Sequence, residues 1–423
     1  MISLLRERRL RRFYLAHLQS QLGTGAAYVA LVLIAYQRLH TSWAIALVLL
    51  ADVLPGIVLS TPFGALADRL SRTRLAVTAE LLSAGAFLAL ALVSSFPATV
   101  ALALAAGVGT AMFRPAVGAA LPELVSEDQR SAATGLYGAI MNLGITVGPA
   151  LTALVLLFGS PELVLGLNGV TFLLAAALLS RVSLGTGAKT RDGASETVWR
   201  ATRAGVGIAR RTPGVPALLL ISAASVFAGA VMNVAEPLLA TGPLHAGKAG
   251  YSLLVAVYGG GMVVMSLLCT SAGSRTARLR VLWLAGNGLC AVGMIGSAAA
   301  PSLVVAAGTF ALTGAANALI LSPEIRLFQQ LVPGGVLGRV LGFRDTAANV
   351  AMLAAFLSAG ALLSLFDTRA VFAIGGVALL ALTVVALFTF KLKPSEQRVT
   401  DGPPVVGVPV GQLAGAELVA GAA

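Results

Sequence analysis

Four ionisable residues lie inside stretches of sequence that are otherwise apolar, and they are the first candidates for chemistry. They are Asp52, Glu80, Arg114 and Glu236. A charge inside a membrane-spanning helix is costly, so such residues indicate functional sites by default. Asp52 stands near the middle of SWAIALVLLADVLPGIVLS, where a carboxyl group resists ionisation and could bind a proton in one state and release it in another. The structural alternative is a protonated carboxyl group that bonds a neighbouring helix.

Arg114 needs a partner, because an unpaired guanidinium in an apolar environment would be very costly. Asp52 and Glu80 are both candidates for that partner, and the sequence does not choose between them. Glu80 could instead pair with an arginine on the cytoplasmic side or extend its carboxylate to the interface. We therefore take Asp52, Glu80, Arg114 and Glu236 together as candidates for proton coupling.

Two polar stripes run along apolar segments. One holds Ser222, Ser225, Gly229, Asn233 and Glu236, and the other holds His17, Gln21, Thr24 and Tyr28; in both, steps of three and four residues place the side chains on one helical face. Such stripes indicate either a wet cavity or hydrogen bonds between helices. We take His17 as structural. The candidates for lining a cavity or contacting a substrate are Gln21, Thr24, Tyr28, Asn142, Ser225 and Asn233.

The elements that must position these residues are long apolar helices. Of the 423 residues, 57% are hydrophobic and 11% are charged, whereas soluble domains carry about 25% charged residues. Apolar runs of about 20 residues recur, which is the length needed to cross a hydrocarbon core, and the alternating pattern of a membrane β-barrel is not seen. The sequence predicts an all-α membrane protein with twelve spans, at 13–37, 43–66, 75–95, 98–121, 132–157, 163–182, 216–240, 250–272, 281–299, 302–322, 339–364 and 370–390.

These spans divide the chain six and six. We expect an arginine-rich cytoplasmic N-terminus at 1–12, six-helix bundles at 13–182 and 216–391, a cytoplasmic linker at 183–215 with a surface helix, and a disordered cytoplasmic tail at 392–423. All but four of the 29 Lys and Arg residues fall on one side of the expected topology. The positive-inside rule places that side, and both termini, in the cytoplasm. The net charge of +12 is therefore a topological bias, and we exclude nucleic acid as a partner.

The two halves also repeat in sequence. An R-x-x-R-x-R pattern at Arg69, Arg72 and Arg74 recurs at Arg275, Arg278 and Arg280, and Gly135 and Asn142 recur at Gly342 and Asn349. Parallel repeats of this kind build transporters with a site near the membrane midplane.

The turn between the second and third spans reads GALADRLSRTR and resembles the G-x-x-x-D-R-x-G-R-R signature of the major facilitator superfamily. The matching residues are Gly64, Asp68, Arg69, Arg72 and Arg74, and the sequence departs from the signature at Ser71 and Thr73. The resemblance covers about residues 13–390. It implies that this turn is a cytoplasmic gate in which the aspartate meets the start of the eleventh span. Asp68 is not repeated, since Ser274 stands at the corresponding place.

The fifth span carries GITVGPALT, which resembles the G-x-x-x-G-P-x-x-G motif of the superfamily's antiporters through Gly144, Gly148 and Pro149, with Thr152 in place of the last glycine. Two glycines four residues apart allow a neighbouring helix to approach closely, and proline removes a backbone bond and bends the span. MFRPAVGAALPELVSEDQR and RAGVGIARRTP resemble the exporter branch that includes siderophore and macrolide effluxers.

The resemblance implies a proton-coupled secondary exporter of a small apolar or amphiphilic compound, such as a drug, natural product or siderophore, in the cell membrane. Its implied partners are the lipid bilayer, the substrate and protons, and it is expected to be a monomer. Uptake or facilitated diffusion of a nutrient, and a sensor or partner role without transport, stay open as alternatives. The sequence holds no phosphate loop, zinc constellation or cofactor motif, so we expect neither an enzyme nor a bound metal or cofactor.

Overall fold

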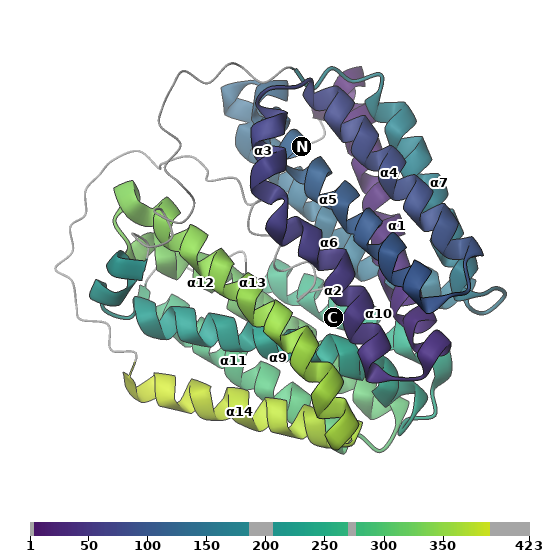
Figure 1. The fold of residues 1–423 in the computed structure, drawn as a ribbon. Coiled ribbons are helices and arrows are strands. Elements are labelled where there is room, and N and C mark those ends of the chain that lie inside the picture. The colour runs from purple at the N-terminus through teal and green to yellow at the C-terminus, as the bar shows by residue number, and fades with distance from the viewer. Residues whose placement is uncertain (1–3, 186–205, 270–275, 390–423) are drawn as a thin grey trace. The chain divides into compact units, whose positions relative to one another are not determined.

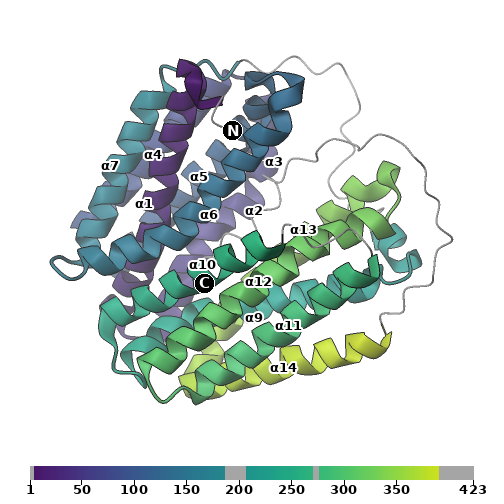
Figure 2. The same cartoon turned by 180° about the vertical axis from the view of Figure 1, so that it is seen from behind.

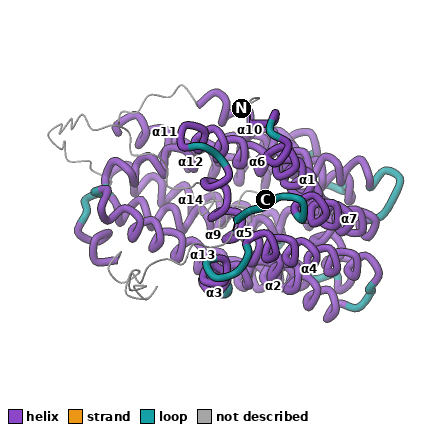
Figure 3. The backbone as a smooth tube through the Cα atoms, turned by 90° about the horizontal axis from the view of Figure 1, so that it is seen from above, coloured by secondary structure: helices purple, strands orange, loops and turns teal. Residues whose placement is uncertain are grey.

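The computed structural model describes residues 4–185, 206–269 and 276–389, and these are helices joined by short loops, without strands (Figure 3). In the first half the helices are η1 (Leu4–Arg6), α1 (Arg8–Leu39), α2 (Ser42–Val58), α3 (Ser60–Ala67), α4 (Arg72–Leu92), α5 (Phe96–Leu124), η2 (Glu127–Gln129), α6 (Arg130–Val155) and α7 (Pro161–Leu179). In the second half they are α9 (Val215–Thr241), α10 (Gly247–Cys269), α11 (Thr276–Ala299), α12 (Leu303–Leu331), α13 (Gly334–Leu365) and α14 (Thr368–Thr389).

Among the described residues, 11 helices are long and apolar enough to cross a membrane, and the bent pair α2 and α3 makes a twelfth span if it is counted as one. The all-helical membrane fold predicted from the sequence is therefore confirmed. The predicted single helix at 43–66 is broken by a 47° bend between Val58 and Ser60. Pro62 explains the break, because it has no N–H to donate to the carbonyl of Val58 and so interrupts the helical ladder.

The chain divides into two compact units. Of the described residues, the N-terminal unit comprises those up to 185 together with 247–256, and the C-terminal unit comprises 206–246 and those from 257 onward. In the N-terminal unit α1 packs between α6 and α7, while α4 packs between α5 and α7 (Figure 1). Its core holds many alanines, including Ala27, Ala76 and Ala103, which let the helices approach closely.

In the C-terminal unit α11 packs between α12 and α14, and α9 packs on α13 (Figure 2). The largest fully buried side chains of this unit include Trp283, Phe310 and Phe328. The predicted surface helix of the linker is described only from residue 206. Residues 206–211 are helical there, and Ala209 is buried in the apolar core of the C-terminal unit. The earlier part of the linker and the predicted disordered tail lie outside the described residues.

Candidate functional site

Asp52 on α2 and Arg114 on α5 form the polar centre of the N-terminal unit. Both side chains are half-buried and their charges interact, although no ion pair within 4.0 Å joins them in the described part of the chain. The two helices cross at Gly107, where any side chain would collide with the backbone carbonyl of Asp52. This crossing fixes the aspartate against α5, while its side chain stays only partly buried.

Tyr137 on α6 extends this polar centre and has no counterpart among the sequence candidates. Its phenol interacts electrostatically with Arg114 and Glu80. Its ring stacks on that of His17, with centroids 4.0 Å apart and planes 5° from parallel. His17 is buried, which agrees with the structural role expected for it. A lone aromatic residue in an apolar stretch carries no spacing pattern, so sequence reasoning had no signal for Tyr137.

The other two candidate acids are packed away from the surface. Glu80 is 2% exposed and Glu236 is 1% exposed, and in the described residues neither carboxylate forms an ion pair. The sequence-based options for Glu80, pairing with a cytoplasmic arginine or reaching the interface, are therefore both wrong. The Oε2 atoms of both acids have no hydrogen-bond partner in the described chain. Burial without a cation favours the neutral, protonated form of a carboxyl group.

The C-terminal unit repeats the Asp52 crossing with different chemistry. Gly314 on α12 packs against the backbone carbonyl of Tyr258 on α10, as Gly107 packs against that of Asp52. The two contacts are related by the same shift of about 207 residues that relates the sequence repeats. The Tyr258 hydroxyl accepts a hydrogen bond of 2.6 Å from Asn317. The duplicated crossing therefore carries an acid in one unit and a hydrogen-bonded tyrosine in the other.

The polar stripe of α9 bonds neighbouring helices of its own unit. Ser225 donates to the carbonyl of Ile221 and lies 2.5 Å from the amide oxygen of Asn287 on α11. Asn233 is 0% exposed. Ser222 donates at 2.7 Å to Glu324 on α12. In this structure the stripe provides hydrogen bonds between helices, which was one of the two alternatives left by the sequence.

The candidates on α1 and α6 lie nearer the surface. Gln21, Thr24 and Tyr28 are half-buried and Asn142 is exposed. The Thr24 hydroxyl donates to the carbonyl of Ser20 within its own helix at 2.8 Å. The carbonyl of Asn142 accepts a 3.0 Å hydrogen bond from Thr146.

A buried ion pair on α12 and α13 is absent from the sequence-based candidates. Arg344 donates to Glu324 at 3.0 Å, and the two side chains are 3% and 1% exposed. Arg344 also meets Asp345 at 3.1 Å, and Glu324 accepts from Trp283 on α11 at 3.4 Å. With Ser222, this network joins four helices. Glu324, Trp283 and Ser222 each stand about two turns from the end of their helix.

The sequence could have indicated this network. Arg344 falls inside the predicted span 339–364, where a charge is as costly as at Arg114, yet it is not among the sequence-based candidates. Glu324 was placed just outside the span predicted to end at 322, whereas α12 continues to Leu331. Extending the predicted span 302–322 by a few residues would have placed Glu324 in one span and Arg344 in the next, as a candidate ion pair.

The turn between α3 and α4 contains residues with different environments. Arg72 is 5% exposed and forms an ion pair of 2.6 Å with Glu123 at the end of α5, so its role is not limited to topology. Thr73, where the superfamily signature has arginine, donates to the carbonyl of Val182 at 3.2 Å. Asp68 is exposed, and its side chain forms no bond with any described residue of the N-terminal unit. Gly64, Arg69 and Arg74 lie in the same turn region, and both arginines are exposed.

The glycines of the span-5 motif lie against α1. A Cβ atom on Gly144 would lie 2.5 Å from the carbonyl oxygen of Gln21, and one on Gly148 would lie 2.5 Å from the carbonyl carbon of Gly25. The close approach predicted for these glycines is thus observed. Thr152 donates to the carbonyl of Ala26 across the same contact at 2.8 Å. We call this backbone contact between α1 and α6 the seam; Pro149 lies within it.

Solved structures of membrane transporters share the fold of this chain. The structure of the nucleoside transporter NupG superposes with a TM-score of 0.73 at 12% identity, covering 91% of this chain and 100% of that one. A peptide transporter of the POT family gives 0.69 at 13% identity, covering 93% and 98% of the two chains. At these identities the likeness shows the fold alone.

The family itself follows from the sequence match over residues 2–410. The chain belongs to the MFS_3 family of the major facilitator superfamily, described as transmembrane secretion effectors. It is thus a multi-pass membrane transporter that acts on a small molecule, and not an enzyme.

Named relatives are distant. The chain is 21% identical to macrolide efflux protein A of Streptococcus pyogenes over 342 residues, covering 79% of this chain and 84% of that protein. It is 24% identical to macrolide efflux protein A of Enterococcus faecalis, covering 72% and 96%. It is 27% identical to the multidrug efflux pump Tap of Mycolicibacterium fortuitum, covering 89% and 95%.

Proposed function

We propose that this transporter exports a small apolar or amphiphilic compound from the cell in exchange for protons, by alternating access. Both termini lie in the cytoplasm in this proposal, and the protein acts as a monomer in the cell membrane. The names of the distant relatives, which describe macrolide and multidrug efflux, support export and this substrate class.

The observation that carries the proposal is that Asp52 lies close enough to Arg114 for their charges to interact. Asp52 is the one candidate acid that is both half-accessible and faced by a cation, whereas Glu80 and Glu236 are packed away. A carrier carboxylate must exchange its proton with water, so accessibility is a requirement. The cation lets the deprotonated form exist in an apolar environment, because an opposite charge favours ionisation. Asp52 is thus our proposed proton carrier and Arg114 its counter-ion.

Asp68 is proposed to control the cytoplasmic gate. Its exposure and its lack of a side-chain partner within its own unit leave its carboxylate available for this role. The exposed Arg69 and Arg74 are proposed to hold the turn on the cytoplasmic side. Replacing Asp68 with asparagine should lower transport without unfolding the protein, and cysteine-accessibility labelling from the cytoplasmic side should increase. Unchanged transport with unchanged labelling would remove Asp68 from the gate.

Export can be measured in everted vesicles incubated with a panel of macrolides, dyes and siderophores in the outer medium. Wild-type protein should accumulate a substrate when respiration acidifies the vesicle lumen, and a protonophore should abolish accumulation. Asp52→Asn should lose gradient-driven accumulation, while Asp52→Glu should keep part of it because it can still carry a proton. Asp128→Asn, which removes an exposed acid next to α6, is the matched control and should behave as wild type.

Four results would contradict the proposal. Accumulation that persists with the protonophore would exclude proton coupling. Full activity of Asp52→Asn would exclude this residue as the carrier. Counterflow in proteoliposomes without any gradient response would favour facilitated diffusion, and binding without flux would favour a sensor.

A further inference from the structure

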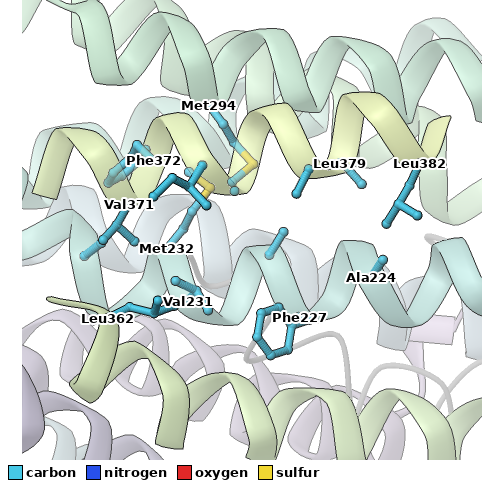
Figure 4. A pocket seen from close by; sticks show the side chains of 15 residues that line it. Ala224, Phe227, Val231, Met232, Met294, Leu362, Val371, Phe372, Leu379 and Leu382 are labelled. Carbon is cyan, nitrogen blue, oxygen red and sulfur yellow. The ribbon is translucent and has the colours of Figure 1, made fainter. Parts of the chain in front are cut away.

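A cavity lies wholly within the C-terminal unit, among α9, α11, α13 and α14 (Figure 4). Its volume is about 280 Å³. Six residues of α9 from Ala224 to Ala235 form one wall, and seven residues of α14 from Val371 to Leu382 form the other. Met294 and Leu362 complete the lining. Every lining residue is a hydrocarbon, thioether or glycine residue, so nothing in the cavity can satisfy a polar ligand.

The cavity is an elongated slot that follows the helices. Each wall extends over twelve residues, or about 16 Å of helix. Figure 4 shows Val371 and Leu362 toward one end and Ala224 and Leu382 toward the other. A cavity of about 280 Å³ extended over this length is elongated rather than round. Its elongated shape and apolar lining suit an extended hydrocarbon chain.

The slot opens toward the outer surface of α14. Ile374 lines it and is 48% exposed, and Ala378 lines it and is also exposed. The α9 wall between Val231 and Ala235 is buried. The exposed face of α14 continues with Val377 and Val385, which are 57% and 56% exposed. An apolar exposed face on a membrane-spanning helix is a lipid-facing one, so a ligand reaches the slot from the bilayer.

A cation stands at the Val371 end of the slot. Arg369 is in the first turn of α14, two residues before Val371, and is half-buried. One of its guanidinium nitrogens donates to the carbonyl of Ala298 at 3.0 Å. Guanidinium has five N–H donors, and within the described chain no acidic side chain forms an ion pair with it. Its other donors can therefore bind a phosphate group.

We propose that the slot binds one acyl chain of a membrane phospholipid whose phosphate group lies at Arg369. The slot supplies the fit for a single chain, and the arginine supplies the headgroup contact at the end where a glycerol backbone would emerge. With both termini in the cytoplasm, the Val371 end is the extracellular one, so the lipid belongs to the outer leaflet. This site is separate from Asp52 and does not depend on the proposed transport reaction.

The test uses the full chain reconstituted in nanodiscs with phosphatidylglycerol that carries a diazirine in its acyl chain. Photocrosslinks mapped by peptide mass spectrometry should fall on Met232, Met294 and Leu379. Arg369→Gln should reduce this labelling about tenfold, as expected for the loss of a charge-assisted hydrogen bond. A diazirine-bearing alkane without a headgroup should label the same residues equally in wild type and Arg369→Gln.

Two further variants test the slot itself. Ala378→Leu and Gly375→Leu place bulk in the slot; the first change is on an exposed residue, and at Gly375 the added Cβ meets only the mobile end of Met294. Both should abolish labelling of Met232. Gly288→Leu on α11, where a Cβ atom meets nothing, is the matched control and should leave labelling intact.

Labelling that is unchanged in the filled variants would overturn the proposal. So would labelling by the phospholipid that is insensitive to Arg369→Gln, since this would remove the headgroup contact. Competition by an exported compound that displaces the phospholipid in proportion to its transport would assign the slot to substrate instead.

Discussion

Replacing Arg344 with methionine should destabilise the C-terminal unit strongly, because it leaves the Glu324 carboxylate buried without a cation. That carboxylate is 1% exposed and would keep only the Ser222 hydroxyl at 2.7 Å and the Trp283 indole at 3.4 Å. Removing one partner of a buried ion pair costs about 3–5 kcal/mol. We expect a loss of that size in the free energy of unfolding.

The reciprocal change should cost less. In Glu324→Gln the amide oxygen still accepts from Ser222, and Arg344 keeps Asp345 at 3.1 Å. The cost of one lost charge-assisted bond is about 1.5–3 kcal/mol. In the double variant neither charge is left alone, so its loss should be smaller than the sum of the two single losses. A coupling energy of about 0.5–3 kcal/mol is expected for residues in contact.

Unfolding by sodium dodecyl sulphate in mixed micelles, followed by far-ultraviolet circular dichroism, measures these differences. Arg278→Met is the matched control, because Arg278 is an exposed arginine of the same unit; a surface change of this kind should stay within about 0.5 kcal/mol of wild type. Single losses below about 1 kcal/mol that simply add in the double variant would refute the reasoning, since they would show that the pair contributes no net energy.

Three further predictions follow from contacts in the N-terminal unit. Gly148→Ala should cost about 1–3 kcal/mol by overpacking the seam, whereas Gly138→Ala on the same helix, where a Cβ atom meets nothing, should be neutral or stabilising by up to about 1 kcal/mol; the same unfolding assay compares them. Glu123→Gln should cost no more than about 1 kcal/mol, since its side chain is 55% exposed; a larger loss would show that its ion pair with Arg72 contributes more than an exposed pair does. Thr152→Val should cost about 1 kcal/mol by removing the hydrogen bond to α1. Equal stability of the variant and the wild type would show that this hydrogen bond contributes no net free energy.

The fold could be predicted because composition and span length are properties of each segment alone. Apolar runs of membrane-crossing length occur in the sequence, and the turn motif after α3 marks the superfamily. The glycine spacing at Gly144 and Gly148 likewise determines a close contact without reference to distant residues. The bend between Val58 and Ser60 was missed, although Pro62 carries its cause, because the run stays apolar through it.

The candidate site was less predictable because it depends on which helix faces which. Glu80 and Glu236 look like Asp52 in a hydropathy pattern, yet only Asp52 is half-accessible beside an arginine. The partnership of Glu324 and Arg344 depends on the packing of four helices and on a boundary misplaced by several residues.

The seam has a mechanical consequence. At Gly25, Gly144 and Gly148 the backbone of one helix lies directly against the other helix, so at these positions there is little side chain that can reorient to absorb a displacement. We therefore expect α1 and α6 to move together at this contact. Bending within this unit is easiest where a backbone hydrogen bond of a helix is missing. The break before Pro62 is such a place, and we expect α2 and α3 to bend relative to each other there.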